Sequence, residues 1–255
     1  MRFASLGSGS RGNALLVEAG DTRVLLDCGF ATRTVAEKLE KLGVSPASLS
    51  GVLVTHEHSD HIAGVFKFAC HYDLPVFLTH GTYAAAPRGK SALPEIRLID
   101  SHTHFVIDDL EILPFPVPHD AREPVQYVFT NGASRLGVLT DTGSITPHIV
   151  DVLGICDALV LECNHDAALL AASNYPAMLK RRISGPRGHL DNAAAASLLR
   201  QIDTSRLQHV VAAHLSQQNN RCELAVAALA SALNCSENWI GMASQDDGFN
   251  WRALP

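Results

Sequence analysis

The chain has 255 residues, and its composition is that of a globular protein with a large core. Hydrophobic residues make up 47% and charged residues 18%, so the chain can bury ample apolar surface and no window resembles a disordered tail. The formal net charge of −6 excludes a generally basic nucleic-acid-binding coat but leaves room for a local basic groove. No apolar run is long enough to span a bilayer, and the first residues lack the apolar stretch of a signal peptide. We therefore expect a cytoplasmic protein with no membrane association.

Strand and helix patterns alternate along the first part of the chain. A glycine-rich turn at residues 7–13 separates the first two expected strands, and apolar residues at Val35, Leu39 and Leu42 predict a helix. The strands expected here are 1–6, 14–18, 23–27, 51–54 and 75–79, and the helices are 32–42 and 62–72.

The second part of the chain continues in the same way. Its expected strands are 105–107, 111–115, 126–130, 135–140, 158–162 and 209–213, and its helices are 145–153, 192–201 (after the possible cap Asp191) and 223–233. Two beta-rich blocks with interspersed helices predict two packed sheets flanked by helices on their outer faces. No proline- or serine-rich linker divides residues 1–255, so we expect one domain.

The cysteines form no CxxC pair and lie in apolar or helical surroundings. We expect reduced, mostly buried thiols, as in a cytosolic protein. They are Cys28, Cys70, Cys156, Cys163, Cys222 and Cys235.

The most informative segment is residues 55–61, Thr-His-Glu-His-Ser-Asp-His, which follows the apolar run 52–54. Neutral imidazole is the commonest nitrogen ligand for zinc and related metals, and carboxylate oxygens are its usual companions. Side chains two apart on extended backbone point the same way, so His56 and His58 can hold one ion together. Asp60 and His61, where the chain turns, face another direction. The segment therefore predicts ligands for two neighbouring metals; the alternative is a polar turn with surplus histidines.

Three later segments share one pattern, an apolar strand that ends in histidine or aspartate at a turn. They offer His119 after 116–118, Asp141 after 137–140 and His214 after 210–213. Each of them alone is more often structural or solvated than a ligand. Combined with residues 55–61, they are candidates for the rest of a metal site.

This ordered set resembles the metallo-β-lactamase superfamily over nearly the whole chain, with Asp27 as an early strand-end aspartate. The resemblance implies an αββα four-layer sandwich with a two-metal site along one edge of the sheets. Asp27 would orient a ligand histidine from behind, or else cap the turn at Gly29. The resemblance implies two ligand triads and one bridging carboxylate: His56, His58 and His119; Asp60, His61 and His214; and Asp141.

The ligand set defines the expected chemistry. Two divalent ions roughly 3.5–4 Å apart can share a bridging hydroxide that attacks a phosphorus or carbonyl centre. Mixed histidine and aspartate ligands suit Zn²⁺ or Mn²⁺, with Fe²⁺ as a third candidate. Aspartate at position 141, where some lactamases have cysteine, resembles the phosphodiesterase and glyoxalase II branches.

Further segments narrow the branch. The turn at 7–13, the segment 161–166 and the segment 188–192 make the chain similar to the small bacterial YycJ-type, or WalJ-like, proteins. That resemblance implies exonuclease-type cleavage of phosphodiesters in DNA or RNA. His189 and His165 are candidates to protonate the leaving group, and they are counted with Asp60 as catalytic. Alternatively, each of these histidines caps a helix or satisfies a buried carbonyl.

A basic stretch is the candidate binding site for substrate phosphates. Lys180, Arg181 and Arg182, with Arg187, form the only strongly basic segment of an acidic chain, and guanidinium groups bind phosphate bidentately. A solvated helix face is the alternative.

Two other functions are weighed against the nuclease. One is hydrolysis of a small ester, either a thioester or a cyclic phosphodiester, because a small substrate needs no long cationic track. The other is a di-iron redox protein or a metal-stabilised regulatory module, but the chain has no CxxC segment. The motifs indicate a nucleic-acid substrate, and no protein partner can be inferred from them.

Overall fold

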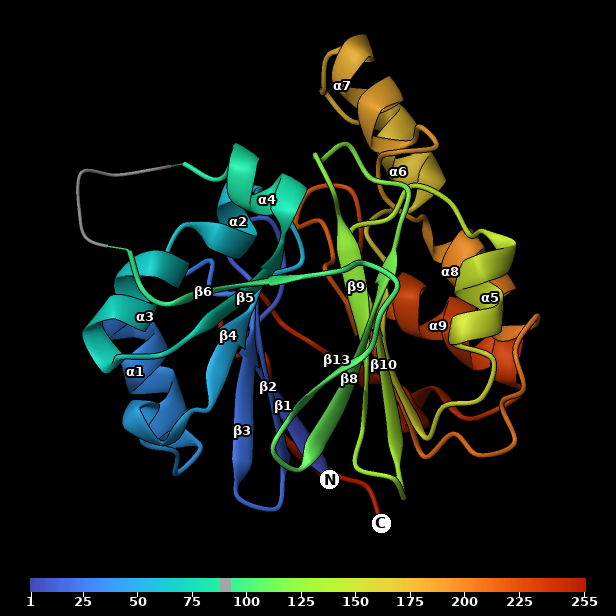
Figure 1. The fold of residues 1–255 in the computed structure, drawn as a ribbon. Helices are drawn as coiled ribbons and strands as arrows, with labels where there is room; N and C mark the ends of the chain where they lie inside the picture. Colours follow the sequence, from blue (N-terminus) through green and yellow to red (C-terminus); the bar gives the residue numbers. More distant parts are fainter. Residues whose placement is uncertain (88–92) are drawn as a thin grey trace.

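The computed structural model describes residues 1–87 and 93–255. Two seven-stranded sheets face each other, and helices cover the outer face of each sheet (Figure 1). The layer order is helices, sheet, sheet, helices, so the predicted αββα sandwich is confirmed.

The first sheet has the strand order β14-β1-β2-β3-β4-β5-β6. Strands β14, β1, β2 and β3 pair antiparallel with one another, and β3, β4, β5 and β6 pair parallel with one another. Their bounds are β1 Arg2–Gly7, β2 Ala14–Ala19, β3 Thr22–Leu26, β4 Gly51–Leu53, β5 Val76–Thr79, β6 Ile96–Ile99 and β14 Phe249–Ala253.

The second sheet has the strand order β13-β12-β11-β10-β9-β8-β7. Strands β7 to β10 are antiparallel to one another, and β10 to β13 are parallel. Their bounds are β7 Phe105–Ile107, β8 Leu110–Pro116, β9 Val125–Thr130, β10 Arg135–Leu139, β11 Ala158–Glu162, β12 His209–Ala213 and β13 Gly241–Met242.

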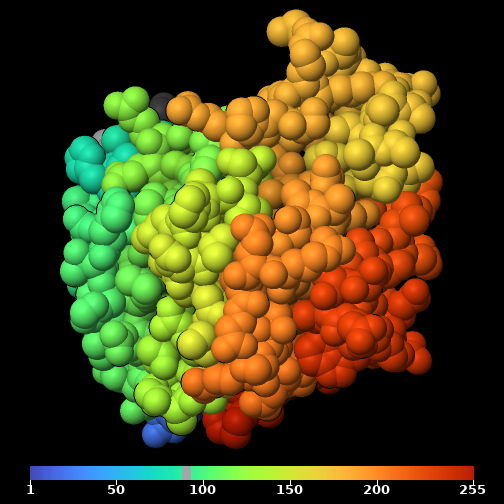
Figure 2. Space-filling model, turned by 90° about the vertical axis from the view of Figure 1, so that its right-hand side faces the viewer, coloured from blue at the N-terminus to red at the C-terminus, as the bar shows by residue number. Residues whose placement is uncertain are grey.

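Helices divide between the two outer faces. On the first sheet's side lie α1 (Thr32–Lys41), α2 (Ser59–Ile62), α3 (Val65–Tyr72) and α4 (His80–Ala85); on the other side lie α5 (Pro147–Val152), α6 (Ala167–Ala172), α7 (Ala177–Ile183), α8 (Asn192–Leu199) and α9 (Cys222–Leu233). Short 3₁₀ turns occupy Pro46–Ser48 and Glu237–Trp239. The segment with α6 and α7 projects above the sandwich (Figures 1 and 2).

Strand alternation builds three apolar layers. In β11, Val160 joins the core between the sheets while Leu159 and Leu161 join the core beneath the helices. In β2, Val17 faces the partner sheet and Leu16 faces the layer of α1 and α3. Successive side chains of a strand point to opposite faces of the sheet, and in these strands both faces are buried.

Most predicted elements are present with shifts of one or two residues at their ends. The expected helix 62–72 is wrong at its start, because a short helix ends at Ile62 and α3 begins at Val65. Asp191 caps α8 as predicted, since its Oδ1 accepts a hydrogen bond from the Ala194 N–H at 2.7 Å. The sequence patterns missed several short elements: α4, α6, α7, β6, β13 and β14.

None of the six cysteines forms a disulfide in the described structure. Cys28, Cys156 and Cys163 are buried, but Cys70 and Cys222 are exposed on helices, so the expectation of mostly buried thiols holds for only half of them. Within the described residues, no helix is both long and apolar enough to cross a membrane.

Candidate metal centre

The candidate centre lies at one edge of the two sheets, where strands end and their loops converge. Strands β3 and β4 of the first sheet are parallel and end just before Asp27 and residues 55–61. In the second sheet, β10 and β12 lie parallel to β11, so Asp141 and His214 follow strands that end at the same edge. Ligands far apart in sequence therefore meet because parallel strands place their carboxyl ends together.

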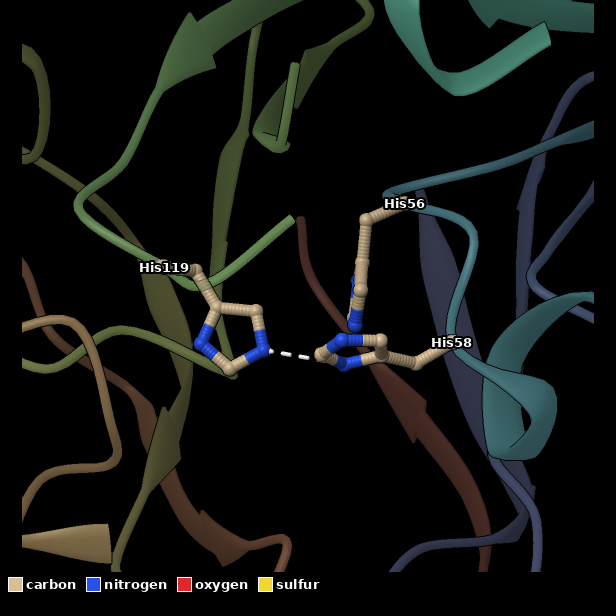
Figure 3. A group of neighbouring side chains, drawn as sticks. All are labelled: His56, His58 and His119. Atoms are coloured by element: carbon tan, nitrogen blue, oxygen red, sulfur yellow. Dashed lines mark hydrogen bonds between the residues drawn. The ribbon is translucent and has the colours of Figure 1, made fainter. Parts of the chain in front are cut away.

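The first predicted triad, His56, His58 and His119, comes together across the two sheets (Figure 3). One ligand atom from each side chain lies within 4.8 Å of the others. His58 Nδ1 is 3.2 Å from His119 Nε2, and His119 Nδ1 donates to the Gly188 carbonyl at 3.0 Å. This last bond leaves Nε2 of His119 aimed at the centre.

The second predicted triad, Asp60, His61 and His214, also comes together, with ligand atoms within 4.8 Å of one another. Asp60 Oδ2 is 3.5 Å from His61 Nε2 and 3.4 Å from His214 Nε2. Asp60 and His61 occupy the first turn of α2, whereas His58 is the residue before that helix. The turn of the chain into α2 separates the two groups of ligands.

Asp141 lies between the triads, as expected for a shared ligand. Its Oδ2 is 3.1 Å from His61 Nε2, and its Oδ1 is 3.4 Å from His214 Nε2. The carboxylate also falls within 4.8 Å of the ligand atoms of His56. The position is held by an unusual backbone, because Asp141 has φ 49°, in the left-handed region.

Two buried atoms test whether these residues fit a cation. His56 Nε2 and Asp141 Oδ2 are buried and have no hydrogen-bond partner among the described residues. An unsatisfied buried nitrogen or carboxylate oxygen costs about 1–3 kcal/mol or more, and a bound cation removes that cost. The donor set, neutral imidazoles with carboxylates at short range, matches divalent metals.

The electrostatics of the cluster also favour a cation. Burial alone raises the pKa of Asp141, but the neighbouring His214 and His61 hold that pKa well below its ordinary value. Burial lowers the pKa of His214, yet Asp141 and the hydrogen bonds of Asp60 and Glu162 raise it to about 10. Without a metal, these carboxylates therefore attract protons onto the histidines, and a divalent ion supplies the same positive charge more compactly.

Comparison with known proteins decides the family. Residues 22–215 match the family described as the beta-lactamase superfamily domain. The chain is 35% identical over 245 residues to "Exodeoxyribonuclease YycJ" of Bacillus anthracis, covering 95% of this chain and 93% of that protein. The chain belongs to the metallo-β-lactamase superfamily.

Two further likenesses place it more closely. "Exodeoxyribonuclease WalJ" of Streptococcus pneumoniae serotype 2 is 29% identical over 94% of this chain and 91% of its own length. The crystal structure of the metallo-beta-lactamase fold protein YhfI from Bacillus subtilis superposes with a TM-score of 0.73 at 14% identity, covering 98% of both chains. The identities to YycJ and WalJ place this metallo-β-lactamase superfamily member in the YycJ- and WalJ-like branch, as predicted, and the YhfI superposition shows the shared fold.

Asp27 stands behind His61, as the resemblance to the superfamily implied. Its Oδ2 accepts a hydrogen bond from His61 Nδ1 at 2.8 Å. The same carboxylate accepts from the Thr55 N–H at 2.8 Å and from the Thr55 hydroxyl at 2.9 Å. These contacts fix the His61 ring with Nε2 toward Asp141, and they favour the orienting role over the turn cap.

Glu162, to which the sequence patterns assigned no role, is part of the centre. It ends β11, is fully buried, and accepts hydrogen bonds from the Thr142 and Leu190 N–H groups at 3.0 and 3.2 Å. Its Oε1 also accepts from His189 Nδ1 at 2.8 Å. Burial raises the pKa of Glu162, but His189 outweighs this and lowers it to about 2. The sequence signal that could have identified Glu162 is its place at the end of an apolar strand.

His189 lies beside both triads. Its ring is 5.2 Å from that of His119 and stacks on that of His214 at 5.5 Å between centroids. The side chain keeps 22% of its surface exposed, so it borders the solvent side of the centre. His165, the other predicted proton donor, is buried, does not belong to any of the ligand groups in the described structure, and has a partnerless Nδ1.

The predicted phosphate-binding residues do not stay together. Arg182 Nε donates to Asp120 at 2.6 Å, and Lys180 Nζ donates to the Ala171 carbonyl at 2.6 Å. With Arg181 they belong to α7, which projects from the sandwich (Figure 2). Arg187, in contrast, lies in a cleft beside His119.

The glycine-rich turn 7–13 supports the centre, which the sequence patterns did not reveal. Asn13 Nδ2 is 3.1 Å from His61 Nε2 and 3.4 Å from Asp60 Oδ2. Ser8 Oγ accepts the backbone N–H of His214 at 2.9 Å. The turn therefore holds the second triad from the first sheet's side.

Proposed function

We propose that the protein is a metal-dependent phosphodiesterase that cleaves nucleic acid, with exonuclease-type action on DNA as the leading case. The observation that carries this proposal is the Asp141 carboxylate between two ligand triads in a chain that matches a protein named exodeoxyribonuclease along 95% of its length. The expected class, a metal-dependent nuclease or phosphodiesterase, agrees with these relatives.

Two divalent ions are proposed, Zn²⁺ or Mn²⁺ with Fe²⁺ as a third candidate. His56, His58 and His119 would hold one and Asp60, His61 and His214 the other, with Asp141 shared. When bound, such ions lower the pKa of a coordinated water toward neutrality and neutralise charge that develops on phosphate oxygens. Asp27, Glu162 and Asn13 keep the ligand side chains in place.

His189 is the proposed proton donor to the leaving oxygen. Its Nδ1 donates to Glu162, which leaves Nε2 for a substrate oxygen. Burial lowers the pKa of His189, but Glu162 and Asp141 more than compensate and raise it above its ordinary value, which favours the protonated ring that a proton donor needs. A positioned acid of this kind contributes roughly 10²–10⁴-fold to a rate. His165 is not needed for this step.

The test is a panel of oligonucleotides that differ in sugar, strandedness and 5′ phosphate, incubated with the protein and Zn²⁺ or Mn²⁺. Cleavage of a polynucleotide supports the proposal, and the products show whether digestion proceeds from an end. Intact oligonucleotides together with turnover of a cyclic phosphodiester or a thioester would replace it with the small-ester alternative. Metal content of the protein as isolated, measured in parallel, gives the number and identity of the ions.

A further inference from the structure

A second feature of the molecule borders the candidate metal centre without belonging to it. A cleft of about 610 Å³ opens beside His119. The side chains that can make polar contacts in it are His102, His119, Arg122, Thr146, His148 and Arg187. We call it the Arg122–Arg187 cleft.

Both arginines are free to bind a ligand. Within residues 1–87 and 93–255, no ion pair engages the Arg122 or Arg187 side chain. The acidic neighbours of Arg122 have other partners than its guanidinium group: Asp120 pairs with Arg182 at 2.6 Å, Glu123 accepts from the Gly81 N–H at 2.6 Å, and Glu57 accepts from the Arg122 backbone N–H at 2.7 Å. The polar lining of the cleft is therefore cationic or neutral, in a chain whose net charge is −6.

The backbone fixes both arginines to the loops of the centre. The Arg122 N–H donates to Glu57 Oε1 at 2.7 Å, and Glu57 stands between His56 and His58 in the chain. On the other wall, a Cβ at Gly143 would lie 2.5 Å from the Arg187 nitrogen. Only glycine allows the loop after Asp141 to pack so closely on the loop of Arg187. A bound molecule that contacts both arginines is thus held at a fixed position relative to the proposed metal-binding residues.

Other clefts lack this combination. A second large cleft, lined by Arg135 and Arg206, has its guanidinium groups engaged by the Val152 carbonyl and by Asp157. On the His214 side of the centre, the cleft with Arg221 also carries the Glu223 carboxylate, and Arg221 donates to the Asn220 carbonyl. Among the clefts described, the Arg122–Arg187 cleft has unpaired arginines beside a proposed metal ligand.

We infer that the Arg122–Arg187 cleft binds the phosphate backbone of a polynucleotide next to the bond that is cleaved. This inference rests on the proposed function and names the surface that holds its substrate. Guanidinium groups bind phosphate through paired N–H donors, and His102 and His148 add donors at the cleft wall. A single phosphodiester would use a small part of 610 Å³, a volume within the range of sites that enclose whole ligands.

The test compares two double variants of the full-length, metal-loaded protein. Arg122→Ala/Arg187→Ala removes the cleft arginines, and the control Arg33→Ala/Arg200→Ala removes two exposed arginines on α1 and after α8. The probe is a fluorescent 5′-phosphorylated single-stranded DNA with phosphorothioate linkages, and binding is followed by anisotropy across a salt series. Circular dichroism checks that both variants are folded.

The cleft variant is expected to bind about tenfold more weakly for each arginine removed. The slope of log affinity against log salt should fall by about 1 per lost phosphate contact, and the control should match the wild type. Equal affinity and slope in the cleft variant and the wild type, an equal loss in the control, or no binding by the wild type overturns the inference. The proposed function fails separately, if the wild type binds the probe but leaves unmodified DNA and RNA intact.

Discussion

The Asp27 carboxylate and the His61 imidazole form a buried pair, with Asp27 Oδ2 2.8 Å from His61 Nδ1 and both side chains less than 5% exposed. Because Nδ1 donates to Asp27, Nε2 is the nitrogen available for a metal. The His61 ring thus lies between the Asp27 carboxylate and the proposed metal site. Removing the Asp27 carboxylate should therefore weaken metal binding.

The substitution Asp27→Asn is expected to lower metal affinity about 10–100-fold while the fold is kept. The amide can still accept one hydrogen bond from Thr55, but it lacks the charge that makes the His61 ring a strong ligand. Metal affinity would be measured by competition with a chromophoric chelator. The matched control is Asp73→Asn, which changes an exposed aspartate with the same left-handed backbone (φ 55°) at the end of α3. Equal metal affinities in the two variants would show that Asp27 does not contribute to metal binding.

Removing the metal is expected to destabilise the whole protein. Without the metal, Asp141 would remain buried and Asp60 half-buried, and protons on the neighbouring histidines would supply the counter-charge. A ligand present at 100 times its Kd stabilises the folded state by about 2.7 kcal/mol, which corresponds to a melting temperature shift on the order of 5–10 °C for a chain of this size. Melting would be followed before and after chelation and again after Zn²⁺ or Mn²⁺ is restored. The variant His56→Ala should show a smaller shift, and identical curves for chelated and loaded wild type would contradict the prediction.

Local sequence pattern was enough to select the proposed metal ligands that follow strands. The apolar run Val52, Leu53 and Val54 predicts a buried strand. The histidines that follow this run are therefore expected to lie at an edge of the sheet. Asp141 and His214 follow equally clear apolar runs, and parallel neighbours bring their ends together. In such cases the position of a residue in its strand already fixes its place in the fold.

Features that depend on distant contacts could not be predicted in this way. Asn13 and Ser8 lie in a turn whose partners, His61 and His214, are tens to hundreds of residues away. His214 has φ 54°, a conformation that costs a non-glycine residue of order 1–3 kcal/mol and that only the assembled site stabilises. The basic run on α7 was the strongest local signal for phosphate, yet Arg122 stands alone in the sequence and comes to line the same cleft as Arg187 only in the fold.

A separate prediction concerns stability at acid pH. Glu18 in β2 accepts from Arg2 and Arg23, both at 2.6 Å. Burial raises the pKa of Glu18, but the two guanidinium groups outweigh it and lower that pKa below its ordinary 4.5. A carboxyl with a depressed folded-state pKa stabilises the protein above its unfolded-state pKa, and this stabilisation is lost as the pH falls through the folded value.

Glu18→Gln should therefore melt below the wild type at neutral pH, and the difference should shrink as the pH falls below about 4.5. Urea or thermal unfolding across this range measures the difference directly. Glu37→Gln, which breaks the exposed pair with Arg33 on α1, is the control and should change little at any pH. A difference for Glu18→Gln that stays constant with pH would show that packing, not charge, accounts for it.

His189 provides the sharpest test of the chemistry. If it protonates the leaving oxygen, His189→Ala should lower kcat on DNA by about 10²–10⁴-fold with a much smaller change in KM. A p-nitrophenyl phosphodiester should be affected far less, because p-nitrophenolate leaves without a proton. The control His71→Ala removes an exposed imidazole on α3 and should leave both substrates unaffected. An equal loss on both substrates would instead mean that His189, held by Glu162 and stacked on His214, serves only to position the ligands.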